Sequence, residues 1–203
     1  MGRTQTFETP AVVAAARDVF WRLGYDGTSL GDLERATALG RSSLYHAFGS
    51  KRGLFEAAVE NYLDLIVRPR LAPLVGGGGQ PADAARNALV DYFAEMADAV
   101  AGSEEGDERA GCLLLISTAG QAGRDTTVRG AVDAYRAELA EAFAAALGRA
   151  LPGAVADDIE CRARLFTALV VAGLTLARVN RGEAVETLRL ARDLAAELPG
   201  AAG

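Results

Sequence analysis

Apolar residues recur every three or four positions along most of the chain, which is the spacing of amphipathic helices. No stretch alternates apolar and polar residues with a period of two, so no strand is expected. Glycines and prolines interrupt the pattern and divide the chain into about nine helices. The sequence therefore predicts an all-α protein.

Three closely spaced helices are expected near the N-terminus. The first begins near Pro10 and ends at Gly24. The second starts at Ser29, with Asp32 in a capping-box arrangement, and a third covers residues 41–48. A four-residue turn joins the second helix to the third, and this organisation is typical of a helix-turn-helix.

The rest of the chain is expected to form longer helices. Pro69, Pro73 and the glycines 76–79 interrupt the pattern and predict a surface connection. The polar, acidic stretch 102–109 predicts a loop. The helices expected from residue 51 onward cover about 51–65, 81–101, a segment that opens near 111, 128–147, 157–181 and 184–198.

The short third helix is apolar on one side and polar on the other. With a rotation of about 100° per residue, hydroxyl and imidazole side chains gather opposite the apolar ones. The apolar side contains Leu44, Ala47 and Phe48, and the polar side contains Ser42 and His46, flanked by Ser43 and Tyr45. Small side chains and polar tips are what a helix needs to enter the major groove of DNA.

Charge supports this interpretation only locally. The formal net charge of −6 argues against attraction of nucleic acid to the whole surface. Between Glu34 and Glu56, however, no acidic residue occurs, and the window carries a charge of +4. Its basic residues are Arg35, Arg41, Lys51 and Arg52.

Residues 10–60 resemble the DNA-binding domain of TetR/AcrR-family transcriptional regulators. The similarity lies in the run Gly24-Tyr25-Asp26-Gly27-Thr28-Ser29-Leu30 and, above all, in Ser43-Leu44-Tyr45-His46-Ala47-Phe48-Gly49-Ser50-Lys51 followed by Leu54-Phe55. The resemblance implies a helix-turn-helix DNA-binding domain over residues 1–52. It also implies a helical effector-binding and dimerisation domain over residues 53–203. Two departures are Ala38, where relatives commonly have glycine in the turn, and Gly40, where they often have a serine cap.

The resemblance also implies roles for individual side chains on double-stranded operator DNA. Tyr45 and Lys51 are expected to hold backbone phosphates, as are Thr28 or Ser29 at the start of the second helix. An N-terminal arm that includes Arg3 is a candidate for the minor groove. The candidates for base edges, or for the phosphates that flank them, are Arg41, Ser42, Ser43 and His46.

The larger C-terminal part is expected to bind a small, largely apolar ligand that releases the DNA. No residue spacing identifies the pocket, and each candidate residue is also compatible with plain core packing. The polar group that orients the ligand is left open among Tyr135, Arg109 and Gln121. The pocket candidates are Tyr92, Phe93, Met96, Leu113, Ile116, Tyr135, Phe143 and Phe166.

The last two helices are the candidates for a homodimer interface, with intramolecular core as the alternative. Two such helix pairs would form a four-helix interface about a two-fold axis. Operator binding also favours a dimer, because two recognition helices must reach half-sites roughly 34–36 Å apart on a palindromic operator. The interface candidates are Leu165, Leu169, Gly173, Leu176, Leu188 and Leu194.

Other classes of function find less support in the sequence. The single histidine leaves no His-based triad in the larger domain, and no P-loop or dinucleotide motif occurs, so no enzyme, cofactor or metal site is expected. A helical scaffold that has lost DNA binding is a rival, but the polar face at Ser42 to His46 argues against it. Among regulators a repressor is favoured over an activator, in the cytoplasm and without a membrane anchor. Cys112 leaves open a thiol-based repressor that senses oxidants or electrophiles, against the alternative of a buried core residue.

Overall fold

The computed structural model describes residues 9–77, 79, 81–104, 107, 109–118 and 125–199. In these ranges the chain is all-α, as predicted. The elements are α1 (Thr9–Gly27), α2 (Leu30–Thr37), α3 (Arg41–Phe48), α4 (Lys51–Tyr62), the π-helix η1 (Leu63–Val67), α5 (Arg68–Val75), α6 (Ala82–Ala101), α7 (Leu113–Ser117), α8 (Thr126–Ala150), α9 (Ala156–Leu176) and α10 (Arg181–Ala196). Because α4, η1 and α5 follow one another without a break, the described residues form nine continuous helices.

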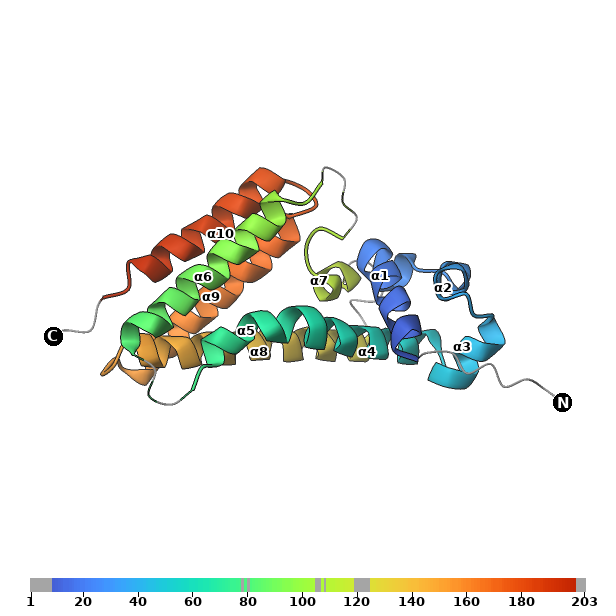
Figure 1. Ribbon diagram of the computed structural model, residues 1–203, viewed down its shortest axis with the longest axis horizontal. Coiled ribbons are helices and arrows are strands. Elements are labelled where there is room, and N and C mark those ends of the chain that lie inside the picture. Colours follow the sequence, from blue (N-terminus) through green and yellow to red (C-terminus); the bar gives the residue numbers. More distant parts are fainter. Residues whose placement is uncertain are drawn as a thin grey trace.

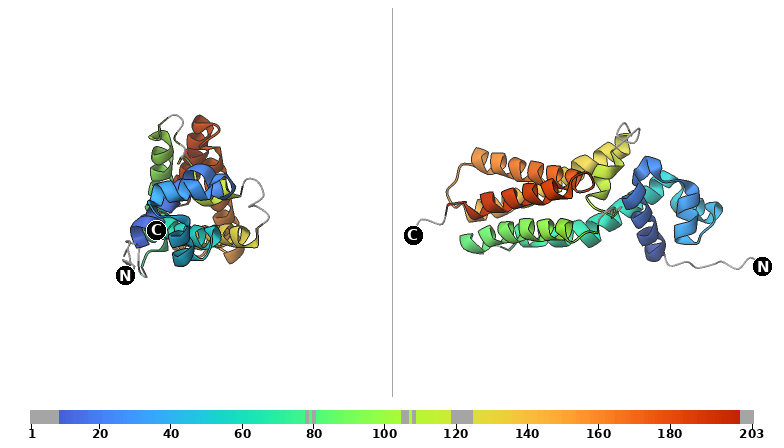
Figure 2. Two further views of the ribbon diagram at one scale, coloured as in Figure 1. Left: turned by 90° about the vertical axis from the view of Figure 1, so that its right-hand side faces the viewer. Right: turned by 90° about the horizontal axis from the view of Figure 1, so that it is seen from above.

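The molecule is elongated, with two ends joined by long helices (Figure 1). Helices α1, α2 and α3 form one end, and α6, α9 and α10 pack together at the other (Figures 1 and 2). The continuous helix from α4 to α5 runs from the first end to the second, and α8 packs along α5. Short α7 contacts α1, α8 and α9, and so lies where the two ends meet. Within the described residues, no helix is long and apolar enough to cross a lipid bilayer.

The N-terminal end has its own aromatic core. The ring of Phe20 lies 5.1 Å from that of Phe55, and Tyr25 lies 4.9 Å from Phe55, both edge to face. Phe55 belongs to α4, so the first part of α4 packs with α1. The domain boundary predicted between residues 52 and 53 therefore falls inside a helix.

Gly24 ends the regular part of α1, as the sequence predicted. Its φ of 70° and ψ of 175° break the helical geometry, and glycine adopts this conformation at little cost. A Cβ atom here would lie 3.3 Å from the carbonyl oxygen of Ile116 in α7. The break therefore lets α7 approach α1 closely.

The prediction that Pro69 and Pro73 break the chain into a surface connection was wrong. Pro69 lies in the first turn of α5, where a missing backbone N–H costs little. Leu71 and Leu74 of α5 are buried, and Arg149 of α8 donates hydrogen bonds to the last carbonyl groups of α5. Packing on α8 therefore maintains the helix despite Pro73, and the connection begins only after Val75.

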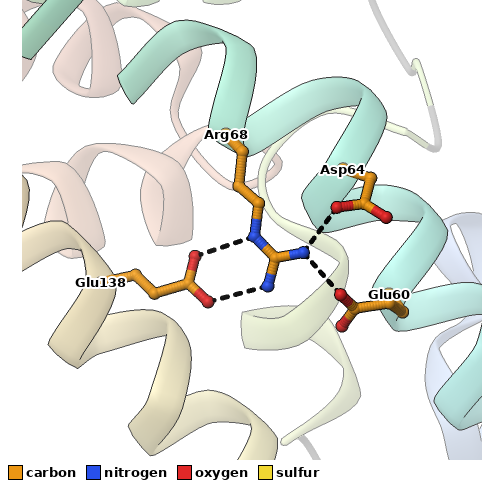
Figure 3. Close-up of polar contacts among 4 residues, drawn as sticks. All are labelled: Glu60, Asp64, Arg68 and Glu138. Carbon is orange, nitrogen blue, oxygen red and sulfur yellow. Dashed lines mark hydrogen bonds and ion pairs between the residues drawn. The ribbon is translucent and has the colours of Figure 1, made fainter. Parts of the chain in front are cut away.

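One arginine holds the π-helical turn against α8 (Figure 3). Arg68 donates to Glu60 at 2.5 Å and to Asp64 at 2.6 Å, both on the preceding turns of its own helix. It also makes a two-pronged contact with Glu138 of α8, at 3.0 and 3.3 Å. The hydrogen bonds to these carboxylates raise the pKa of Arg68, and the bond to Glu138 contributes most. The contact joins the long helix to α8 midway between the two ends of the molecule.

Candidate nucleic-acid interface and internal cavity

Helix α2 begins with the capping box that the sequence predicts. The Ser29 hydroxyl oxygen accepts a hydrogen bond of 3.2 Å from the backbone N–H of Asp32. The Ser29 N–H donates to the Asp32 carboxylate at 2.9 Å. These bonds satisfy two backbone N–H groups that a bare helix end would leave open. A hydrogen bond of 2.5 Å from the Ser29 hydroxyl to the Asp32 carboxylate, together with the bond from the Ser29 N–H, lowers the pKa of Asp32.

The turn between α2 and α3 shows how the two departures from the family pattern are accommodated. Ala38 adopts the left-handed conformation, with φ 56° and ψ 22°, that glycine would supply more easily. Gly40 offers no side-chain cap to α3. Instead, the Glu34 carboxylate accepts a hydrogen bond of 2.6 Å from the N–H of Arg41. Glu34 was not predicted to cap α3, because its role depends on how the turn folds back.

Helix α3 presents its polar side to solvent. Leu44 is buried, Phe48 and Tyr45 are half-buried, and Ser42 and His46 are exposed. Arg41 and Ser43 are exposed as well. Ala47, predicted on the same side as Leu44 and Phe48, is exposed.

Two hydroxyl candidates at the start of α2 differ in position. Thr28 is only 2% exposed, and its hydroxyl donates to the Gly24 carbonyl at 2.6 Å. Its side chain is thus occupied inside the fold and does not reach the surface. Ser29 is exposed. Of the pair, only Ser29 lies at the surface, where its hydroxyl donates to the Asp32 carboxylate at 2.5 Å.

The four cations of the basic window fall into two kinds. Arg35 pairs with Asp32, and Arg52 pairs with Asp125 at the N-terminus of α8. Within the described residues, Arg41 and Lys51 form no ion pair.

Arg41 lies 5.3 Å above the ring of Tyr45, and the Lys51 amino group lies 4.5 Å from the ring centre of Tyr25. Burial lowers the pKa of Lys51, while nearby Asp26 opposes that shift. Arg41 at the start of α3 and Lys51 at the start of α4 thus each lie against an aromatic ring and not in an ion pair within the described residues. Arg3 lies outside the described residues.

A cavity of about 280 Å³ lies between the two ends of the molecule. Trp21 of α1 and Tyr62 of α4 form one side, and α6, α8 and α9 complete it. Its other lining residues are Ile66, Val67, Arg70, Tyr92, Met96, Ala99, Val100, Ser103, Asp107, Arg109, Ala110, Gly111, Tyr135 and Leu174.

Only part of the predicted pocket lines this cavity. Tyr92, Met96 and Tyr135 do, and Arg109 lies with them, whereas Gln121 is outside the described residues. The remaining candidates lie elsewhere. Leu113 is fully buried, and Ile116 is half-buried beside Gly24.

The other three candidates form an aromatic cluster that Tyr92 joins to the cavity, since its ring meets those of Phe93 and Phe143 edge to face. Phe93 stacks on Phe143 at 5.4 Å, and Phe166 lies 5.8 Å from Phe143. Trp21, Tyr62 and Arg70 were not predicted to line the pocket, because only the tertiary fold brings α1, α4 and α5 to this cavity.

Cys112 lies behind the cavity wall. It is fully buried, and its thiol is within hydrogen-bonding range of the hydroxyls of Tyr62 and Tyr135. Burial raises the pKa of the thiol, and these contacts offset the shift only in part. The environment therefore favours the protonated thiol, not a reactive thiolate.

The comparisons with known proteins agree on one family. The model of bacterial regulatory proteins of the tetR family matches residues 12–58. The HTH-type transcriptional regulator YezE of Bacillus subtilis is 32% identical over 150 residues, which cover 74% of this chain and 73% of YezE. The chain belongs to the TetR family.

Other members show the same relationship. The HTH-type transcriptional repressor ComR of Escherichia coli is 34% identical over 114 residues, or 56% of this chain and only about half, 51%, of ComR. The structure of the TetR-family regulator CifR with 26-bp operator DNA has a TM-score of 0.78 and 28% identity, covering 94% of this chain and 98% of that chain. The TetR assignment thus extends from the helix-turn-helix to the whole helical fold.

Helices α9 and α10 of this TetR-family chain each leave a leucine side chain in solvent. Leu165 of α9 is 48% exposed, and Leu190 of α10 is 52% exposed. Three further leucines proposed for a dimer interface are half-buried: Leu169, Leu176 and Leu194.

Two residues predicted for the dimer interface lie inside the protomer instead. Gly173 and Leu188 are buried, and a Cβ atom on Gly173 would lie 2.9 Å from Cγ of Leu188. They therefore pack α9 on α10 within one chain. The prediction was wrong because α10 carries apolar residues on two sides, and periodicity does not say which side faces α9. The same ambiguity concealed Leu190.

Proposed function

We propose that this TetR-family chain is a homodimeric repressor in the cytoplasm that binds a palindromic operator and is released by a small molecule. The two ends of the molecule would have separate roles. The end formed by α1, α2 and α3 reads DNA, and the helices beyond it dimerise and enclose the effector.

The exposed polar side of α3 carries the proposal. Ser42, Ser43 and His46 present small polar groups with no apolar side chain large enough to prevent close approach to base edges. Arg41 and Lys51, which form no ion pair among the described residues, are suited to phosphates. Tyr45 is half-buried and adds a hydroxyl at the same edge. Ser29 extends the phosphate contacts to the N-terminus of α2.

A dimer through α9 and α10 would cover exposed leucines and would supply the two recognition helices that a palindromic operator requires. The exposed leucines Leu165 and Leu190 gain a partner in such an interface. Their half-buried neighbours, Leu169, Leu176 and Leu194, would extend the same patch. For a palindromic operator, the two-fold axis would have to place the two copies of α3 on the same side of the assembly, about 34–36 Å apart, as half-sites on successive turns require.

The cavity is placed to couple ligand binding to DNA release. Trp21 lies on α1 and also lines the cavity, and its indole N–H donates to the Gly111 carbonyl at 3.1 Å. Arg178 at the end of α9 donates to the carbonyl groups of Ala110, Arg22 and Trp21. A ligand that displaces Trp21 therefore changes how α1 is held. Release requires different ligand affinities for the two arrangements, and a coupling of about 1–3 kcal/mol changes operator affinity about 5–150-fold.

The names of similar proteins also support a repressor that binds operator DNA. CifR is described in complex with its operator DNA, and ComR is described as a repressor. The thiol-sensing alternative gains no comparable support, because Cys112 is buried and its pKa is raised.

The first test is binding to DNA. A mobility-shift assay with the duplex upstream of the protein's own gene, in excess nonspecific DNA, should show a specific complex. The expected complex contains two protomers for each site. Specific binding by one protomer, or no preference over nonspecific duplex, would contradict the proposal.

The second test is the oligomeric state. Sedimentation at micromolar concentration should give a dimer, and Leu165→Glu with Leu190→Glu should give a folded monomer, because charged groups would be forced into the interface. Arg136→Glu serves as the control and should remain dimeric, because the Arg136 side chain lies on the exposed surface of α8. A monomeric wild-type protein would contradict the dimer.

A further inference from the structure

The walls of the cavity are flat and aromatic on several sides. The rings of Trp21 and Tyr62 meet edge to face with centres 4.9 Å apart, and Tyr92 and Tyr135 line the same space. Aromatic walls favour a flat ring that stacks on them or meets their edges. A cavity of about 150 Å³ holds benzene, and this one has a volume of about 280 Å³. The space suits one ring with a short substituent.

Two arginines belong to the described lining of the cavity. Arg70 and Arg109 line it, against the single carboxylate of Asp107 among the described lining residues. Arg70 donates one hydrogen bond, of 3.0 Å, to the Ile66 carbonyl on its own helix.

The neighbouring acidic groups leave both guanidinium groups available. Asp91 and Glu95 lie on the other side of Arg70, yet in the described part of the chain neither reaches ion-pair distance. Arg109 meets Asp18 only at 4.0 Å. Both guanidinium groups therefore keep donors for an anion that enters the cavity.

The Tyr92 hydroxyl adds a neutral donor, whereas the hydroxyls of Tyr62 and Tyr135 lie within hydrogen-bonding range of the Cys112 thiol. Burial raises the pKa of Tyr62, Tyr92 and Tyr135, so their hydroxyl groups remain protonated. Arg70 lies close enough to Tyr62 and Tyr92 for its charge to act on both hydroxyls. The polar part of the cavity thus offers donors, which select against a cationic ligand.

We propose that the cavity binds a small aromatic carboxylate, with its ring among Trp21, Tyr62 and Tyr135 and its carboxylate toward Arg70 and Arg109. The inference rests on the proposed function, since it names the class of the effector for that same cavity. It differs from the sequence-based expectation of a largely apolar ligand, because Arg70 was not visible in the periodicity.

The chain contains a natural reporter for this site. Trp21 is its single tryptophan, and it lines the cavity. Titration of the full-length protein with benzoate or phenylacetate should change Trp21 fluorescence saturably. Free N-acetyltryptophanamide, titrated in parallel, corrects for light absorbed by the probes. The neutral amides benzamide and phenylacetamide should bind about tenfold more weakly or worse, because they lack the charge.

Variants separate charge from shape. Arg70→Gln and Arg109→Gln should each weaken carboxylate binding about tenfold and leave amide binding unchanged. Arg136→Gln, whose arginine pairs with Asp133 outside the cavity, should bind both as the wild type does. Circular dichroism spectra and melting curves confirm that each variant folds. Equal affinity for acid and amide, unchanged binding in both cavity variants, or no response to either acid would overturn the proposal.

Operator binding is measured on the same samples, which separates the two proposals. If the protein binds an operator but neither carboxylate alters Trp21 fluorescence, the ligand class is wrong and the regulator stands. If a carboxylate binds through Arg70 and Arg109 but no DNA is bound, the cavity assignment stands and the regulator is wrong.

Discussion

The indole N–H of Trp21 donates a 3.1 Å hydrogen bond to the carbonyl oxygen of Gly111, joining residues 90 positions apart in the sequence. Gly111 adopts a φ of 88°, and a Cβ atom on it would lie 2.6 Å from the Leu174 carbonyl oxygen in α9. One glycine therefore allows α1, α9 and the segment before α7 to meet. This junction also borders the cavity.

Gly111→Ala should destabilise the protein by about 2 kcal/mol or more. The added methyl group would clash with a backbone oxygen, and alanine would have to hold a left-handed conformation. Urea unfolding followed by circular dichroism measures the change.

A glycine in open space provides the matched control. Gly130 lies within α8, and no atom lies near the position of its Cβ. Gly130→Ala should stabilise the protein by about 0.5–1 kcal/mol, because alanine favours the helix. If both substitutions had the same sign, the packing assigned to Gly111 would be incorrect.

Lys51→Gln should weaken binding to every DNA duplex by a similar factor. A lost phosphate contact removes one counterion release, so the slope of log K against log salt should fall by about 0.9. Binding is measured over a range of salt concentrations on operator and on nonspecific DNA. Arg136→Gln, which removes a charge from α8, should leave the slope unchanged. A slope that Lys51→Gln does not alter would remove Lys51 from the DNA contacts.

Local features of the DNA-binding end could be predicted from the sequence. The capping box at Ser29, the break at Gly24 and the eight-residue α3 depend on neighbouring residues, and the structure agrees with them. The similarity to TetR proteins added the assignment of roles. Thr28 shows the limit, because its hydroxyl binds the preceding turn, and a sequence motif does not reveal which hydroxyl is buried.

The residues that line the cavity, and the helix faces that pack together, could not be predicted from the sequence because they depend on tertiary structure. Trp21, Tyr62 and Arg70 come from three helices, and no spacing in the sequence relates them to Tyr135. Periodicity distinguished apolar positions from polar ones, but it did not separate Phe143 in the core from Tyr92 at the cavity. At Pro73, packing against α8 outweighed the local tendency of proline to end a helix.

Tyr135→Phe should reduce the loss of stability at alkaline pH. The folded pKa of Tyr135 is raised well above the reference value of 10.0, so its contribution is complete below about pH 10 and is lost as the pH rises further. Between about pH 9 and about pH 11, the variant should lose up to about 1.4 kcal/mol less per pH unit than the wild type. Urea unfolding at both pH values gives the comparison. Equal losses would show that the hydroxyl ionises as freely in the folded protein as in the unfolded one.

Cys112 should be unreactive in the folded protein. In a Cys161→Ser background, which leaves Cys112 as the single thiol, modification by a disulfide reagent should occur at the rate of unfolding. Peroxide should leave operator affinity unchanged in the same protein. Rapid modification under native conditions, together with loss of DNA binding, would restore the redox-sensing alternative.

Selection from a random pool of DNA duplexes tests the central claim most directly. The wild-type protein should enrich an inverted repeat with half-site centres about 34–36 Å apart. A variant with Ser42→Ala, Ser43→Ala and His46→Ala should fold normally and lose this preference, while it retains weak binding to any duplex through Arg41 and Lys51. Enrichment of no sequence by the wild type, or of the same repeat by the variant, would contradict DNA recognition through α3.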